Sequence, residues 1–168
     1  MSIDRPDMVP PVHARLFEML NRHRAEYRMI SHSPGATTEE ASRFRGHDPA
    51  AAAKSIILCV RKTRKESRYV LAVVPGDRRV DFRRVRSLFS AIDVSFAPLP
   101  VAERLAGSPS GTFMPFVFSP ELDIVVDAGL AHHDEIFFNV GLADRSISMK
   151  ASAYLSLSAP RIAEIAAD

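Results

Sequence analysis

The spacing of hydrophobic and polar residues along the chain predicts a succession of short helices and strands. Apolar residues recur every three or four positions near the N-terminus, which predicts a helix over Val12–His23. Short apolar or alternating runs predict strands at Tyr27–Ile30, Ser55–Arg61, Arg68–Val74, Asp93–Ala97, Phe116–Phe118, Asp123–Val126, Ile136–Val140 and Ser146–Met149. Capping residues predict short helices after Thr37, Asp48 and Asp81, and one that ends at Gly107. The C-terminal stretch from Ala151 is helical in character, with an interruption near Pro160.

The strand that follows Lys54 is the most apolar of the predicted strands. Its aliphatic residues occupy both odd and even positions, which is typical of a strand covered on both faces. Because side chains alternate along a strand, Lys54 shares a face with Ile56, while Ser55 lies on the other face. A lysine at the mouth of such a strand either extends to water or points into a cleft.

The order of these elements indicates the fold class. Strands outnumber helices and show no regular alternation with them, which favours an α+β protein. We expect a single domain over residues 12–168, with a mixed, mostly antiparallel sheet curved around a substrate cleft and flanked by helices. Residues 1–11 contain three prolines and no period, which predicts a mobile N-terminal tail.

Composition limits the possible locations and cofactors. Of the 168 residues 46% are hydrophobic and 25% charged, as in average globular domains. No apolar run approaches the roughly 20 residues that span a bilayer, and the N-terminus lacks the pattern of a secretory signal. With one cysteine, the chain can form neither an internal disulfide nor a thiolate metal cluster. We therefore expect a cytoplasmic protein without membrane contact.

The formal charge is +2 overall but is unevenly distributed. The segment 61–86 holds ten basic and three acidic residues, a charge of +7, which leaves −5 for the rest of the chain. This asymmetry is typical either of a surface that attracts a polyanion or of an ordinary solvated hairpin and helix face. The candidate residues for binding such a polyanion are Arg61, Lys62, Arg64, Lys65, Arg83 and Arg84.

The sequence lacks the common catalytic motifs. It contains no Gly-x-Ser-x-Gly elbow, P-loop or GxGxxG. The run His132–Glu135 does not have the helical spacing of metal ligands, so we interpret it as an exposed turn and expect no metal and no cofactor. The glycine- and proline-rich loop 107–116 carries three large apolar residues, so we expect it to fold over a core or a pocket. Gly111 would let the loop backbone approach a ligand closely. The N–H groups of the loop could then donate hydrogen bonds to a carbonyl oxygen of that ligand.

Several segments, in this order, resemble the YbaK/prolyl-tRNA-synthetase-associated domain, a family of freestanding aminoacyl-tRNA editing proteins. The resemblance runs from Ile30 to about Leu157, and its motifs are His32 with 37–41, Ala53–Leu58, Tyr69–Val80, Gly111–Phe116, Asp127 and Phe138–Gly141. The chain departs from the family at two places. Val117 stands where members often have a glycine, and the histidine that some branches have after the last strand is missing near Ala143–Ser146.

The resemblance implies a deacylase that hydrolyses the ester of mischarged tRNA. It assigns the catalytic role to Lys54 and an acyl pocket to the loop Gly111–Pro115. Candidate substrate-binding residues are then His32, Gly111, Thr112, Phe113, Met114, Pro115, Phe116, Asn139 and Gly141. The implied partners are the acceptor end of charged tRNA and an aminoacyl-tRNA synthetase. A non-catalytic RNA-binding module of the same fold, and a protein acting on small aminoacyl compounds, are the alternatives.

Overall fold

The computed structural model describes residues 10–33 and 48–168. The predicted tail lies outside these ranges except for Pro10 and Pro11, as does the predicted helix after Thr37. The helices are α1 (Pro11–Arg22), η1 (Pro49–Ala51), α3 (Phe82–Leu88), α4 (Leu99–Ala106), η2 (Ala128–His132) and α5 (Ala151–Ser158). The strands are β1 (Tyr27–Ser31), β2 (Ala53–Arg61), β3 (Ser67–Pro75), β4 (Asp93–Phe96), β5 (Leu122–Asp127), β6 (Glu135–Asn139), β7 (Arg145–Lys150) and β8 (Arg161–Ala163).

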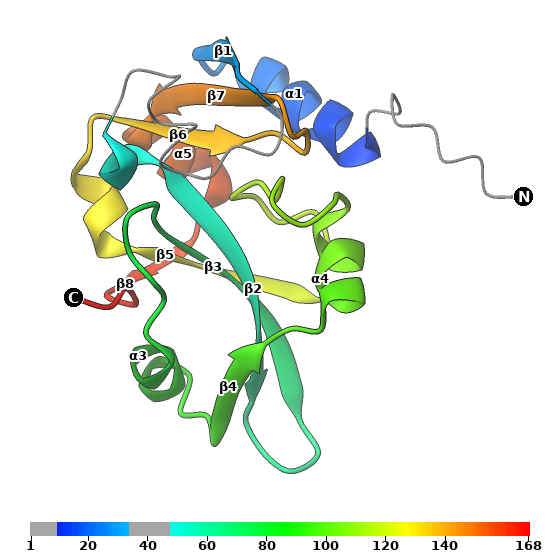
Figure 1. Cartoon of the computed structure of the whole chain (residues 1–168), viewed down its shortest axis with the longest axis vertical. Helices are drawn as coiled ribbons and strands as arrows, with labels where there is room; N and C mark the ends of the chain where they lie inside the picture. Colours follow the sequence, from blue (N-terminus) through cyan, green and yellow to red (C-terminus); the bar gives the residue numbers. More distant parts are fainter. Residues whose placement is uncertain (1–9, 34–47) are drawn as a thin grey trace, which may run out of the picture.

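Within the described residues the strands form two sheets. One is antiparallel, in the order β1-β7-β6, and the other is mixed, in the order β4-β2-β3-β5-β8. Figure 1 shows the long β2–β3 hairpin extending away from the three-stranded sheet, with α3 and β4 beside its far half. This arrangement confirms the α+β class, and its strands are divided between two sheets where the sequence predicted one.

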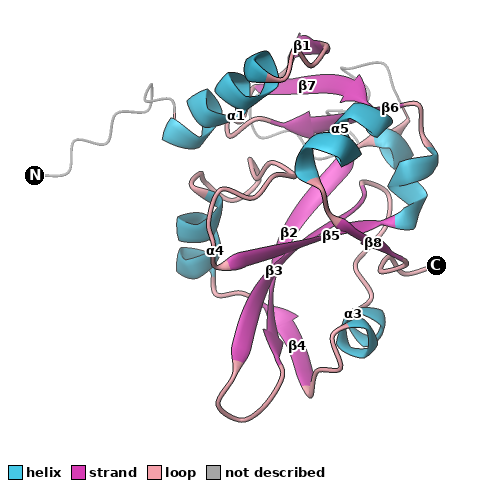
Figure 2. Ribbon diagram, turned by 180° about the vertical axis from the view of Figure 1, so that it is seen from behind, coloured by secondary structure: helices cyan, strands magenta, loops and turns pink. Residues whose placement is uncertain are grey.

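Both faces of the β2–β3 hairpin are buried, as the apolar pattern of β2 predicted. Odd-numbered residues of the two strands, such as Ile57 and Leu71, join the larger core with α1, α4, α5 and the three-stranded sheet. Even-numbered residues, such as Leu58 and Val70, join a second core with α3, β4 and the C-terminal segment. Figure 2 shows the larger sheet from behind, where β5 follows β3 and β8 lies beside β5 at the edge of the sheet.

Two predicted elements are wrong. Residues 116–118 form no strand, because Phe116 enters the larger core while the preceding carbonyl, that of Pro115, accepts a bond from the Tyr154 hydroxyl at 2.7 Å. The segment after Pro160 is not helical, since β8 pairs in parallel with β5. Asp127 holds the C-terminal segment beyond β8, because its Oδ1 accepts hydrogen bonds from the N–H groups of Ile165 and Ala166, both at 2.9 Å.

Candidate functional site

A cavity of about 190 Å³ lies where the two sheets meet. The two sheets come together through a parallel bridge between Ala52 and Phe137. Three segments far apart in the sequence form the walls: the start of β2, the loop 107–116 and β6. The lining residues are Ala52, Ala53, Lys54, Ser55, Gly111, Phe113, Phe137, Phe138 and Asn139. The loop therefore closes over both a core and a pocket, as its composition predicted.

One edge of β2 is open beside this cavity. The strand pairs with β3 over its whole length, but β4 pairs with it only from Leu58 onward. The carbonyls of Ile57 and Arg61 accept bonds from the β4 side, from Ala97 and Ile92. Because peptide groups alternate in an antiparallel strand, the N–H and C=O of Ser55 point to the same edge. No strand in residues 10–33 or 48–168 covers this edge at Ser55.

Ser55 is also one of the residues that line the cavity. Its Oγ is buried and has no hydrogen-bond partner among the described residues. Buried hydroxyls are nearly always paired, so the Oγ of Ser55 has an unused hydrogen-bonding capacity next to the cavity. No signal in the sequence indicated that Ser55 lines the cavity.

Lys54 lies at the mouth of the cavity and is half-buried. Its Nζ donates to the carbonyl of Arg78 at 2.5 Å. Burial lowers the pKa of Lys54, the positive charge of Arg79 lowers it further, and Asp77 acts in the opposite direction. The ammonium group is thus held by a turn of the main chain and can lose its proton more readily than a free lysine.

The loop 107–116 is tied to the strands around it by its carbonyl groups. The Asn139 amide donates to the Gly111 carbonyl at 3.1 Å, and the Gly141 N–H donates to that of Thr112 at 3.1 Å. The Thr112 side chain bonds within the loop, to the carbonyl of Pro109 at 2.6 Å. The N–H of Thr112 also donates to the Pro109 carbonyl, so this N–H group is not available to a ligand.

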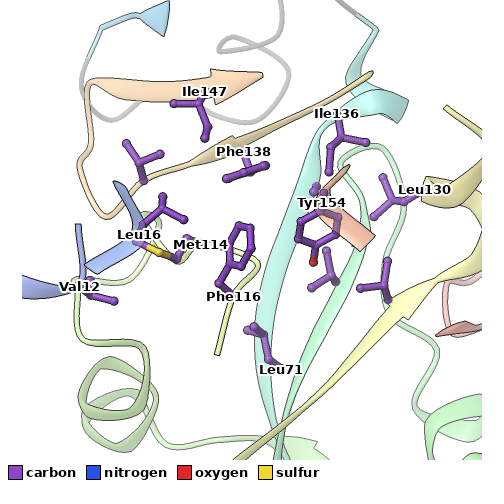
Figure 3. Packing of buried hydrophobic residues seen from close by; sticks show 14 of the residues in the cluster. Val12, Leu16, Leu71, Met114, Phe116, Leu130, Ile136, Phe138, Ile147 and Tyr154 are labelled. Atoms are coloured by element: carbon purple, nitrogen blue, oxygen red, sulfur yellow. The ribbon is translucent and has the colours of Figure 1, made fainter. Parts of the chain in front are cut away.

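The large side chains of the loop go to different places. Phe113 is half-buried and lines the cavity, whereas Met114 and Phe116 belong to the larger core and are not among the lining residues. Figure 3 shows Phe116 next to both Phe138 and Tyr154, whose ring centroids lie 5.7 and 5.2 Å from its own. Of the three residues expected at the pocket, the structure brings Phe113 to its surface.

His32 reaches the cavity only through other residues. Its Nε2 lies 2.9 Å from the Ser146 hydroxyl, which in turn donates to Asn139 Oδ1 at 3.4 Å. Gly141, with φ of +84°, packs on the core side of the loop, and neither it nor His32 lines the cavity. These two residues support Asn139 and the loop from behind.

The basic residues divide into two groups. Arg61, Lys62, Arg64 and Lys65 lie at the tip of the β2–β3 hairpin, and Arg83 is exposed on α3. Lys54 and Arg61 are seven residues apart on one strand, which corresponds to about 23 Å at 3.3 Å per residue. Arg84 is held within the fold, since it donates to the Ala166 carbonyl at 2.6 Å and pairs with Asp81 and Asp168.

Neither a metal site nor a membrane span is evident in the described part of the chain. No group of three or more His, Cys, Asp and Glu residues is arranged there to hold a metal ion. No helix in residues 10–33 or 48–168 combines the length and apolar character that crossing a membrane requires.

The fold and the cavity define an α+β domain with a small cavity beside a lysine. The family model described as "Aminoacyl-tRNA editing domain" matches residues 32–157. The multifunctional Ser/Thr-tRNA deacylase ProXp-y of Escherichia coli K12 is 30% identical over 151 residues, which cover 89% of this chain and 90% of that protein. The chain therefore belongs to the family of aminoacyl-tRNA editing domains and is a hydrolase of the ester that joins an amino acid to tRNA.

Solved structures share the fold. The crystal structure of the hypothetical protein APE2540 is similar with a TM-score of 0.81 and 19% identity, covering 91% of this chain and 99% of that one. A crystal structure described as that of a candidate trans-editing enzyme for prolyl-tRNA synthetase has a TM-score of 0.77 and 19% identity, covering 96% of this chain and 100% of that one.

Proposed function

We propose that this chain hydrolyses tRNA charged with a small, hydroxyl-bearing amino acid, serine or threonine. The unpaired Oγ of Ser55, a residue that lines the cavity of about 190 Å³, carries this proposal. The volume is below the roughly 300–1,000 Å³ of sites for drug-sized ligands, which favours a small acyl group. A hydroxyl on that group would supply the missing hydrogen-bond partner. The Escherichia coli relative, by its name, acts on Ser- and Thr-tRNA.

The ester would be cleaved by water that attacks its carbonyl carbon. The tetrahedral intermediate carries negative charge on the former carbonyl oxygen, which the Lys54 ammonium and the N–H of Ser55 at the open edge of β2 would stabilise. As the intermediate collapses, the bond to the ribose oxygen breaks, that oxygen takes a proton, and free amino acid and tRNA leave. Within the loop Gly111–Pro115, the N–H groups of Gly111 and Phe113, which line the cavity, would bind the same carbonyl oxygen.

The cavity wall supplies no evident base to activate the water. None of the described residues that line it has a carboxylate or an imidazole. We therefore propose that the free hydroxyl of the terminal ribose assists the attack, with Lys54 holding that ribose. This makes the substrate part of its own catalytic arrangement, and it predicts that a substrate lacking that hydroxyl is bound but hydrolysed slowly.

A panel of charged tRNAs tests the activity and the role of Lys54. Loss of a group that stabilises a developing oxyanion lowers kcat by about 10²- to 10³-fold, which is the loss we expect for Lys54→Ala. Lys150→Ala is the matched control, because Lys150 is exposed at the end of β7 and does not line the cavity. Full activity in Lys54→Ala would refute the catalytic role. Salt-sensitive tRNA binding without turnover in the wild type would instead favour the non-catalytic RNA-binding alternative.

The choice of amino acid is tested at Ser55. Ser55→Ala is expected to lower kcat/KM for Ser-tRNA and Thr-tRNA by about tenfold, corresponding to one lost hydrogen bond, and to leave Ala-tRNA little affected. The ratio of kcat/KM between Ser-tRNA and Ala-tRNA is the quantity to measure. A ratio that does not change on substitution would remove Ser55 from substrate recognition.

The exposed basic residues of the hairpin tip and Arg83 are proposed to bind phosphates of the acceptor stem. A site about 23 Å from Lys54 along β2 suits the stem, while the 3′ end reaches the cavity. Each lysine or arginine removed should lower the slope of log K against log salt by roughly 1.

A synthetase is a further candidate partner, supported by the solved structure described for prolyl-tRNA synthetase. Because its substrate belongs to translation, we propose the cytoplasm as its location.

A further inference from the structure

A second hollow, of about 450 Å³, lies on the other side of Lys54. Its walls come from the even-numbered face of β2, from the turn before α3, from the start of α3 and from the end of β4. The residues that line it are Lys54, Ile56, Arg79, Val80, Phe82 and Phe96. Lys54 is thus shared by this hollow and by the acyl cavity, so a ligand bound around Lys54 can extend into both.

Phe96 is unusually exposed for a large apolar side chain. It is 63% exposed, the highest fraction among the exposed large hydrophobic residues of the described chain. The Phe82 ring packs against it nearly edge-on, with centroids 5.0 Å apart and the planes at 71°. This contact fixes the Phe96 ring and leaves much of it open to solvent. A fixed, exposed aromatic ring beside a cation is a suitable platform for a flat aromatic group.

The charge of the hollow is positive on the side next to the acyl cavity. Lys54 and Arg79 are its two ionisable lining residues, and both are cations. They lie close enough for the Arg79 charge to act on Lys54. The main chain holds Arg79 in place, because its carbonyl accepts the N–H of Ala167 at 2.7 Å. An aromatic wall with two cations at one side matches a ligand that has a flat base and a phosphate.

We propose that this hollow binds the 3′-terminal nucleoside of the tRNA, with its base stacked on Phe96 and its phosphate close to Arg79. The inference rests on the proposed function, since the acyl group in the first cavity and the base in the second are joined through a ribose at Lys54. Every tRNA ends in the same nucleoside, so the hollow contributes equally to all charged tRNAs. Selection among amino acids is then left to the acyl cavity.

The substitution that tests the platform is Phe96→Ala, with Phe96→Trp as the variant that keeps a stacking surface. Loss of one base-aromatic stack weakens binding by about five- to 150-fold, so KM for charged tRNA should rise by that factor in Phe96→Ala while kcat stays within about twofold. Phe96→Trp should stay near the wild type. Ile92→Ala is the matched control, because Ile92 is 51% exposed and does not line the hollow. Circular dichroism establishes that the variants are folded.

Two measurements separate this inference from the activity itself. The trinucleotide CCA, which carries no acyl group, is titrated into each protein with labelled phenylalanine rings and followed by NMR. We expect the Phe96 signal to shift, and the Kd to rise five- to 150-fold in Phe96→Ala. A charged minihelix without its terminal base should show the same KM with wild type and Phe96→Ala.

The outcomes are distinct. An unchanged KM in Phe96→Ala, or CCA binding that leaves the Phe96 signal in place, overturns the inference even if the enzyme deacylates tRNA. Absence of deacylation by the wild type overturns the proposed function, while CCA binding at Phe96 would still support the nucleoside site.

Discussion

Asp127 is the residue whose removal is expected to destabilise the fold most directly. Its Oδ1 accepts the N–H groups of Ile165 and Ala166, and its Oδ2 accepts that of Gly129, each at 2.9 Å. Ile165 and Ala166 are 0% and 2% exposed, so water cannot replace the carboxylate there. Asp127→Ala would therefore leave two buried N–H groups without an acceptor and release the C-terminal segment from β5.

The expected loss follows from the number of unpaired groups. Each buried donor left without a partner costs about 1–3 kcal/mol, which gives about 2–6 kcal/mol for the two residues. Gly129 adds less, since it is only half-buried and water can reach its N–H. A loss of this size is a large fraction of the roughly 5–15 kcal/mol by which domains are stable. Urea denaturation followed by circular dichroism measures it as a fall in the midpoint at constant slope.

A second aspartate on the same strand provides the control. Asp123 pairs with Arg68 at 2.8 Å, but its side chain is 41% exposed, so Asp123→Ala should cost only about 0–1 kcal/mol. Asp127→Asn should be intermediate, because one oxygen is kept while the amide N–H₂ faces the N–H of Gly129. If Asp127→Ala and Asp123→Ala differ by less than about 1 kcal/mol, the argument from buried donors is wrong. The rate of deacylation per folded molecule should be unchanged in Asp127→Asn. Asp127 belongs to one of the motifs that resemble the family, but its bonds in this structure hold the C-terminal segment.

Further predictions concern the lysine and two glycines. Because the pKa of Lys54 is lowered, activity that needs its ammonium form should fall on the alkaline side before the ordinary lysine range is reached. Arg79→Gln should move that fall to higher pH and Asp77→Asn to lower pH, in rates corrected for spontaneous ester hydrolysis. Gly141→Ala should destabilise the fold by about 1–2 kcal/mol in urea because of its positive φ, since the added Cβ would make only ordinary van der Waals contacts, at 3.4 Å or more. Gly111→Ala, with nothing within 4 Å, should show only the strain.

Local chemistry accounts for the elements that the sequence predicted well. Asp81 accepts the N–H groups of Arg83 and Arg84 at the start of α3, as its position before an apolar period indicated. Gly107 ends α4 with φ of +75°, where an L-residue would be strained. The hairpin of β2 and β3 needs only two neighbouring apolar runs and a polar connection. Each of these features depends on residues a few positions apart.

Features that depend on distant partners could not be predicted in this way. β8 exists because its three residues meet the free edge of β5 and because Asp127 binds the segment beyond it. Periodicity placed Lys54 and Ser55 on opposite faces of β2 correctly, yet it gave no sign of the open edge. That edge arises because β4 is short and starts to pair only at Leu58. The role proposed for Ser55 thus follows from the length of another strand.

The way the loop 107–116 is held decides how the acyl cavity can select its ligand. Asn139, Gly141 and Tyr154 bind three carbonyls of the loop, and they come from β6, the turn after it and α5. The loop can therefore move only if bonds to several elements break together, each worth about 0.5–1.5 kcal/mol. In the proposed acyl site, a wall fixed in this way would keep its volume whether or not substrate is bound, and would exclude large acyl groups by shape. Selection between small ones, which differ little in volume, must then depend on polar groups such as Ser55.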